Sequence, residues 1–200
     1  NLGGVLRAAV TAANRFLERG LIVSHEGRGE SVLYEADAQA ARFAGTPLVV
    51  LVDGSSASAS EVFAAALQEH RVAALVGEPT YGKGMVQQVQ SFGDEMVVKL
   101  IASYYFTPSH QNLERTLEHA WASGITPDVQ VELTGAEREA LHAHLATYSP
   151  PEASVEAIRA WEHDEVRALL PAWPPDAQLE AALALFRGER PETWVAQAEH

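Results

Sequence analysis

Apolar residues near the start of the chain recur at helical spacing. They fall three or four positions apart, which places them on one face of an α-helix, and Gly20 suits the C-terminal end of that helix. The positions are Leu6, Ala9, Val10, Ala13, Phe16 and Leu17. We therefore expect an amphipathic helix with one face on a core.

Short apolar runs then alternate with helical segments. Residues 48–52 form the uninterrupted run Leu-Val-Val-Leu-Val, which is typical of a central strand covered on both faces. The composition turns helical from Ala59 to Arg71, and residues 72–76 have a strand pattern. Further strands are predicted at residues 21–23, 31–34, 85–89 and 96–101. This alternation predicts the α/β class.

After Pro127 the sequence pattern changes from alternating strands and helices to mainly helical segments. Thr134 and Glu137 have the spacing of a capping box, which marks the start of a helix. Helical periodicity follows at residues 155–170 and again at residues 179–186. We predict a core over residues 1–149 and a helical C-terminal segment over residues 150–200.

Composition narrows the function classes. The 27 acidic residues outnumber the 14 basic ones, for a formal net charge of -13, which argues against the broad phosphate-binding surface of a nucleic-acid-binding protein. Because the chain has no cysteine, disulfides, thiol nucleophiles and thiolate metal sites are excluded.

The eight histidines are scattered along the chain, so we expect no metal site, and we expect no cofactor. No apolar run of about 18 residues predicts a membrane span.

Small residues crowd the junction between the run at 48–52 and the following helix. The sequence there is Ser55-Ser56-Ala57-Ser58-Ala59-Ser60-Glu61. A hydroxyl at such a junction lies near the free N–H groups of the helix, which stabilise negative charge on a substrate oxygen. Ser58 and Glu61 also have capping-box spacing, and for this segment alone an ordinary helix cap is the favoured interpretation.

Lys83 is flanked by two glycines, in Tyr81-Gly82-Lys83-Gly84-Met85. A lysine becomes a useful general base where burial disfavours its charged form, although for this segment alone a solvated turn lysine is favoured. The spacing from Gly77 to Lys83 also matches the opening of a phosphate-binding loop. That match is incomplete, because Gly84 stands where Ser or Thr is required and the following residues predict a strand instead of a helix.

Several further short segments belong to the same set of motifs as the segments around Ser58 and Lys83. They are Asn1-Leu2-Gly3-Gly4, Gly77-Glu78, Gln87, Thr107-Pro108 and Gly124-Ile125-Thr126-Pro127-Asp128. Together, over roughly residues 1–133, they resemble the carboxyl-terminal processing (tail-specific) serine peptidases, a family with a Ser/Lys dyad. The resemblance implies a layered crotonase/ClpP-like α/β core.

The resemblance also implies a role for each site residue. Ser58 would attack the peptide carbonyl, Lys83 would take its proton, and Gln87 would orient the lysine. The residues expected to supply oxyanion-hole N–H groups are Ala59 and either Gly3 or Gly4.

The resemblance implies an endopeptidase of the cell envelope, outside the cytoplasm, that acts on polypeptides with accessible C-terminal tails and accepts them as an added strand. The chain opens with loop sequence at Asn1, so we expect further residues upstream. The resemblance implies that these include a strand and a PDZ domain. The helical C-terminal segment is a candidate surface for self-association.

A few positions depart from the family pattern. They are Leu2 in place of Pro, Asp53 in place of Asn, Ser55 in place of Gly, and Ser109-His110-Gln111 in place of Gly-Arg. None removes a catalytic group. Two other functions stay open: a crotonase-like enzyme acting on acyl-thioesters, and a catalytically silent homologue that binds tails or scaffolds an assembly.

Overall fold

The structure is a computed structural model that describes residues 1–92, 96–115, 124–147 and 173–189. The chain divides into two compact units, one of Asn1–Val131 with Ala181–His200 and one of Glu132–Glu180. The expected site residues all belong to the first unit. The predicted boundary between residues 149 and 150 falls outside the described residues and stays a prediction.

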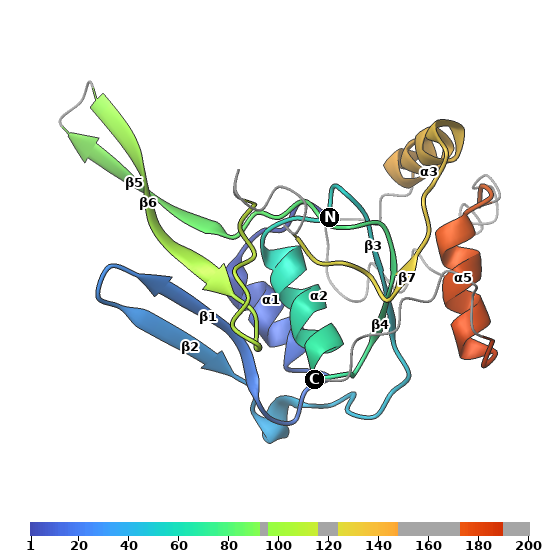
Figure 1. Ribbon diagram of the computed structural model, residues 1–200, viewed down its shortest axis with the longest axis horizontal. Coiled ribbons are helices and arrows are strands. Elements are labelled where there is room, and N and C mark those ends of the chain that lie inside the picture. The colour runs from blue at the N-terminus through green and yellow to red at the C-terminus, as the bar shows by residue number, and fades with distance from the viewer. Residues whose placement is uncertain (93–95, 116–123, 148–172, 190–200) are drawn as a thin grey trace. The chain divides into compact units, whose positions relative to one another are not determined.

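The first unit contains two sheets in its described part. The antiparallel sheet has the order β2-β1-β6-β5, and the parallel sheet has the order β3-β4-β7. The strands are β1 (Leu21–Gly27), β2 (Ser31–Glu35), β3 (Val49–Val52), β4 (Ala74–Gly77), β5 (Met85–Phe92), β6 (Met96–Phe106) and β7 (Val129–Gln130). A short 3-10 helix covers Ala38–Ala40. The four strands predicted at residues 21–23, 31–34, 85–89 and 96–101 are confirmed. They form two antiparallel hairpins and extend further than the sequence pattern indicated (Figure 1).

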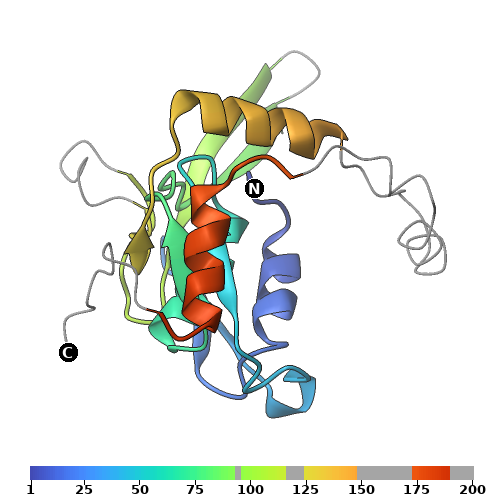
Figure 2. The same cartoon turned by 90° about the vertical axis from the view of Figure 1, so that its right-hand side faces the viewer.

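Two helices pack side by side in this unit, α1 (Leu6–Ala13) and α2 (Ala59–Glu69), as Figures 1 and 2 show. The predicted first helix is confirmed but is shorter than its apolar stripe, since residues 14–16 form a turn; Leu17, which follows it, is still buried. Its buried face joins a core that includes Ile22, Leu67 and Leu75. The α/β class is confirmed.

β3 is not the central, fully covered strand that its apolar run predicted. It pairs in parallel with β4 on one side, and among the described residues no strand pairs with its other side. Leu51 is 42% exposed. A branched apolar run favours a strand, but it does not determine how many neighbours that strand has.

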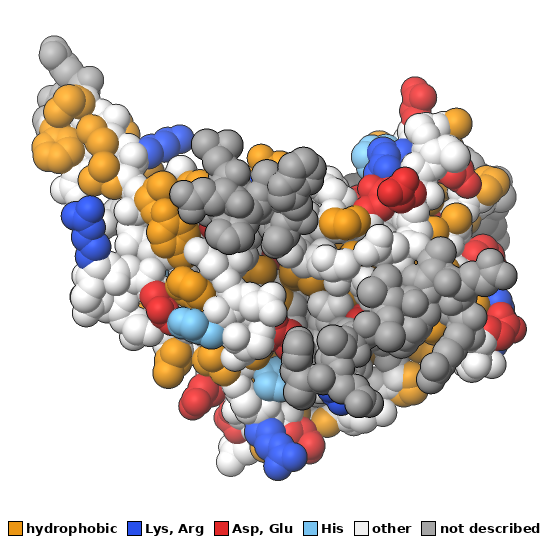
Figure 3. All heavy atoms as spheres, viewed as in Figure 1, with side chains coloured by type: hydrophobic (Ala, Val, Ile, Leu, Met, Phe, Trp, Pro, Cys, Tyr) orange, Lys and Arg blue, Asp and Glu red, His pale blue; other side chains and the backbone are white. Residues whose placement is uncertain are grey.

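The hairpin of β5 and β6 extends away from the core (Figure 1). Figure 3 shows hydrophobic side chains gathered along it. Those that are more than half exposed are Val89, Phe92, Met96, Val97, Leu100 and Ile101.

Of the described helices, none is both long enough and apolar enough to cross a bilayer.

The second unit contains α3 (Gly135–Thr147), and α5 (Ala177–Phe186) begins in it. The predicted capping box precedes α3, because the Thr134 N–H donates to Glu137 Oε2 at 2.8 Å and the Glu137 N–H donates to Thr134 Oγ1 at 3.3 Å. The helix expected over 179–186 is also confirmed, whereas the one expected over 155–170 lies outside the described residues.

Candidate active site

Ser58 occupies a strained turn between β3 and α2. It is the last residue before the helix and has φ 58° and ψ -122°, a region that residues other than glycine rarely adopt. Such backbone strain persists only where the surroundings hold the residue in place, and it is common at functional sites. The candidate nucleophile is therefore held in an uncommon backbone conformation.

Asp53 organises the start of this turn. Its Oδ1 accepts hydrogen bonds from the backbone N–H and the hydroxyl of both Ser55 and Ser56, at 2.7 to 3.0 Å. Burial raises the pKa of the Asp53 carboxyl, but the bonds from the two serines outweigh it, so the net pKa lies below the ordinary value. Ser55 and Asp53, both departures from the family pattern, thus form one local network.

Glu61 joins the Ser58 turn to the segment that carries Lys83. It is 0% exposed, and its carboxylate accepts one hydroxyl and three backbone N–H groups. The donors are Ser58 N at 2.7 Å, Thr80 Oγ1 at 2.6 Å, Gly82 N at 2.7 Å and Lys83 N at 2.9 Å. A buried carboxylate needs such partners to offset its desolvation. The sequence identified Glu61 only as half of a capping box.

The structure brings the backbones of Ser58 and Lys83 together, because both N–H groups donate to the same Glu61 atom, Oε2. Lys83 itself is exposed, so the burial that favours a neutral amine is not provided by the described residues. Gln87 lies on β5 and is also exposed; its side-chain nitrogen is 3.6 Å from the Met85 sulfur. No described hydrogen bond joins Gln87 to Lys83.

Gly3 packs directly against the Ser58 turn. A Cβ on Gly3 would lie 2.5 Å from Ala57 O, 2.9 Å from Ala59 N and 3.0 Å from the Ser58 Cβ, whereas one on Gly4 would have no atom within 4 Å. The Gly3 N–H donates to Asn1 Oδ1 at 2.9 Å. Ala59 is the first residue of α2, so its N–H has no acceptor within the helix.

Ala59 and both glycines that are candidates for the oxyanion hole line one cavity. It has a volume of about 420 Å³, and Gly3, Gly4 and Ala59 contribute to its wall together with residues of α1 and β3. Grouping these positions, which lie far apart in the chain, required the tertiary fold.

Thr80 is a site residue that the sequence did not reveal. Besides donating to Glu61, its Oγ1 accepts the Ile125 N–H at 2.7 Å, and its own N–H donates to Ile125 O at 3.1 Å. Nearby, Asp128 accepts the Leu75 N–H at 2.7 Å. The Gly-Ile-Thr-Pro-Asp segment is therefore hydrogen-bonded to Thr80, three residues before Lys83, and to Leu75 on β4. A single threonine in a turn carries no pattern that would have marked it.

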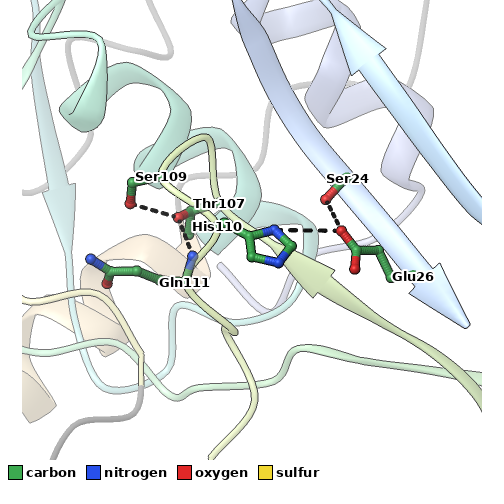
Figure 4. A network of polar contacts seen from close by, with 6 residues as sticks. All are labelled: Ser24, Glu26, Thr107, Ser109, His110 and Gln111. Atoms are coloured by element: carbon green, nitrogen blue, oxygen red, sulfur yellow. Dashed lines mark hydrogen bonds and ion pairs between the residues drawn. The ribbon is translucent and has the colours of Figure 1, made fainter.

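The loop after β6 holds the residues that replace the family's Gly-Arg. His110 Nδ1 lies 3.5 Å from Glu26 Oε1 on β1, and Thr107 Oγ1 lies within hydrogen-bonding distance of both the Ser109 hydroxyl and the Gln111 N–H (Figure 4). Ser109 also donates to Glu69 at the end of α2, through its N–H at 2.6 Å. The loop therefore has contacts of its own to a strand and a helix.

Comparison with known proteins identifies the family. The model of peptidase family S41 matches residues 1–131 of this chain. The chain belongs to peptidase family S41. Among its relatives, the carboxy-terminal-processing protease of Bartonella bacilliformis is 34% identical over 194 residues, which cover 94% of this chain and 43% of that protein. A chloroplastic carboxyl-terminal-processing peptidase 2 of Arabidopsis thaliana is 36% identical over 64% of this chain and 24% of that protein.

Solved structures agree with this assignment. The photosystem II D1 C-terminal processing protease matches with a TM-score of 0.58 and 34% identity, over 65% of this chain and 32% of that one. A putative S41 protease from Bacteroides fragilis has a TM-score of 0.56 at 14% identity, over 94% of this chain and 43% of that one, which shows the shared fold. The resemblance and the peptidase fold expected from the sequence are both confirmed. The chain spans less than half the length of these relatives.

Proposed function

We propose that this chain is the catalytic core of a serine endopeptidase that cleaves polypeptides near their C-termini, with Ser58 as the nucleophile and Lys83 as the general base. The shared hydrogen-bond acceptor, Glu61 Oε2, is the observation that carries the proposal, since it joins the backbones of two residues far apart in the sequence. Membership of peptidase family S41 and the names of the relatives support the same class.

The proposed reaction has two halves. Ser58 Oγ attacks the carbonyl carbon of the substrate while its proton passes to Lys83 Nζ. The tetrahedral intermediate then collapses, the C–N bond breaks, and Lys83 returns the proton to the leaving amine. In the second half, Lys83 takes a proton from a water molecule that attacks the ester, and that proton goes back to Ser58 Oγ as the acid product leaves.

The negative charge that forms on the substrate oxygen needs fixed donors. The Ala59 N–H at the start of α2 is one, and a backbone N–H from Gly3 or Gly4 is the second. The close packing of Gly3 on residues 57–59 and the common cavity support this pairing. The Gly3 N–H would have to leave Asn1 Oδ1 to take part.

The base function requires that Lys83 lose its contact with water, because a solvated lysine amine is protonated near neutral pH. β5 is the outer strand of its sheet as described, and it begins two residues after Lys83. An extended substrate that adds to this edge would cover the lysine. Gln87, on the same strand, would orient the amine.

The proposal extends to the wider activity of the protein, and the processing-protease names of the relatives support polypeptide substrates. Polypeptides with accessible C-terminal tails are the proposed substrates, and the cell envelope or an equivalent compartment outside the cytoplasm is the proposed location. A PDZ domain upstream and self-association through the C-terminal helices complete the proposal.

The test compares cleavage of an unstructured fluorogenic peptide with a free apolar C-terminus and of its C-terminal amide, using the full-length protein. Ser58→Ala and Lys83→Met should abolish turnover while the circular dichroism spectrum stays unchanged, and Gln87→Ala should reduce turnover less. The free-acid peptide should be cleaved faster than the amide.

Equal cleavage by the wild type and by both dyad variants would end the proposal. No cleavage by any of them, with retained binding of the peptide, would favour a silent tail-binding homologue. Binding of coenzyme A with no loss on Lys83→Met would favour a crotonase-like enzyme.

A further inference from the structure

Four consecutive backbone N–H groups around Lys83 donate to carboxylates. Those of Gly82 and Lys83 donate to Glu61, at 2.7 and 2.9 Å. Those of Gly84 and Met85 both donate to Oε2 of Glu114, at 2.7 Å each. Two acidic side chains from different parts of the chain therefore hold the lysine segment from its two ends.

Glu114 is closely packed against this segment. A Cβ on Gly84 would lie 2.3 Å from Glu114 N, so only glycine permits this approach. Beside it, the Arg115 N–H donates to Gly82 O at 2.9 Å, and the Tyr105 N–H donates to Gly84 O at 2.7 Å. The main chain on both sides of Lys83 is thus bonded to the strand β6 and to the segment that follows it.

The position of Glu114 is itself determined by the loop after β6. Its N–H donates to Asn112 Oδ1 at 2.8 Å, and the Leu113 N–H donates to Tyr105 O at 3.2 Å. Upstream, the loop reaches β1 through His110 and α2 through Ser109 (Figure 4). Glu114 therefore extends from a segment with several anchors.

These contacts constrain the direction of the Lys83 side chain. The Lys83 N–H belongs to the peptide plane before the Lys83 Cα, and the Gly84 N–H belongs to the plane after it. Once both planes are fixed, the direction of the Cα–Cβ bond is fixed as well. Bonds to ionised carboxylates are about twice as strong as those between neutral groups, so Glu61 and Glu114 together set the direction in which the Lys83 side chain leaves the backbone.

We propose that Glu114 is a positioning residue for Lys83, acting through the backbone of Gly84 and Met85 without touching the substrate. The inference rests on the proposed role of Lys83 as the general base. Misplacing a base by about 1 Å can reduce the rate roughly a hundredfold. The prediction is a loss of kcat, not of substrate affinity.

The experiment measures kcat and KM on the free-acid peptide for Glu114→Ala, Glu114→Gln and Glu114→Asp in the full-length protein. Glu114→Ala should lower kcat roughly ten- to a hundredfold with KM within about twofold. Glu114→Gln keeps an oxygen that can accept both N–H groups and should recover most of kcat. Glu114→Asp keeps the charge but is one methylene shorter, and it should resemble the alanine variant. Glu30→Ala, at an exposed hairpin turn, is the control for loss of one acidic charge.

A second measurement does not depend on turnover: the rate at which a fluorophosphonate reagent labels Ser58, followed against pH. Glu114→Ala should slow labelling, and Glu114→Gln should restore it. If Glu114→Ala does not fold, kcat and the labelling rate of Glu114→Gln are compared with those of Glu114→Asp. The proposal predicts that Glu114→Gln is the faster of the two, and equal rates would contradict it.

Wild-type kcat in Glu114→Ala, or a Gln variant as slow as the Ala variant, would overturn the inference. Lys83→Met, measured in parallel, separates the two proposals. Full activity of Lys83→Met removes the proposed function itself, whereas an inactive Lys83→Met beside a fully active Glu114→Ala removes only the role of Glu114.

Discussion

The hydroxyl of Thr80 donates to Oε1 of Glu61 over 2.6 Å, and both side chains are almost completely buried. The contact connects the turn before the lysine segment to the first turn of α2. Because Oε1 also accepts the Gly82 N–H and Oε2 accepts the N–H groups of Ser58 and Lys83, the Glu61 carboxylate connects the two segments of the candidate site.

Replacing Glu61 should therefore destabilise the whole unit. Glu61→Ala removes the acceptor of four donors, and each buried donor left without a partner costs about 1–3 kcal/mol. We expect the free energy of unfolding to fall by at least about 3 kcal/mol, as measured by urea denaturation. Glu30→Ala, at an exposed hairpin turn, is the comparison, and an equal effect of the two substitutions would contradict the prediction.

Thr80 offers a sharper test of the same network. Thr80→Val keeps the shape but loses the hydroxyl, so Glu61 loses a donor and the Ile125 N–H loses its acceptor. The expected loss of stability is about 1–3 kcal/mol. Thr80→Ser retains the hydroxyl and should lose only about 1 kcal/mol. The prediction fails if serine and valine have the same effect in thermal or chemical unfolding.

Gly3 and Gly4 should respond differently to substitution by alanine. Gly3 has φ 87° and no room for a Cβ beside Ala57 O, whereas Gly4 has open space. Gly3→Ala should displace residues 1–4 from the Ser58 turn and reduce peptide cleavage roughly tenfold or more. Gly4→Ala keeps its N–H and should retain near-wild-type kcat. Similar kinetics of both variants would show that the close packing of Gly3 has no role.

Asp53 should make stability depend on acidic pH. Its pKa is lower in the folded protein than its ordinary value of 3.8, so the folded state favours the ionised form. The stabilisation is fully present above the ordinary pKa and is lost as the pH falls through the lower, folded value. Unfolding measured between pH 6 and pH 2 should show this loss, to which other carboxyls also contribute.

The matched variant is Asp53→Asn. Its Oδ1 can accept the same four bonds but has no charge to titrate, so the stability of this variant should depend less on pH over that range. A slope identical to that of the wild type would mean that Asp53 contributes nothing to it.

The sequence predicted much of the local structure because its signals are local. The stripe from Leu6, the capping box of Thr134 with Glu137 and the helix beginning at Ala59 depend only on neighbouring residues, and all three are present in the structure. The family was recognisable for a related reason, since its motifs are short segments around Ser58 and Lys83.

The sequence alone determined that the chain is an α/β protein of a recognisable peptidase family, and which residues are candidates for its chemistry. Only the tertiary structure decided that β3 is an edge strand among the described residues, that Lys83 is exposed, and that Gly3 rather than Gly4 packs on the Ser58 turn. It also decided that Glu61, Thr80 and Glu114 hydrogen-bond to or around the segments that carry Ser58 and Lys83. Strand neighbours, burial and hydrogen bonds between distant segments depend on how the chain packs in three dimensions. The spacing of residues along the chain does not contain that information.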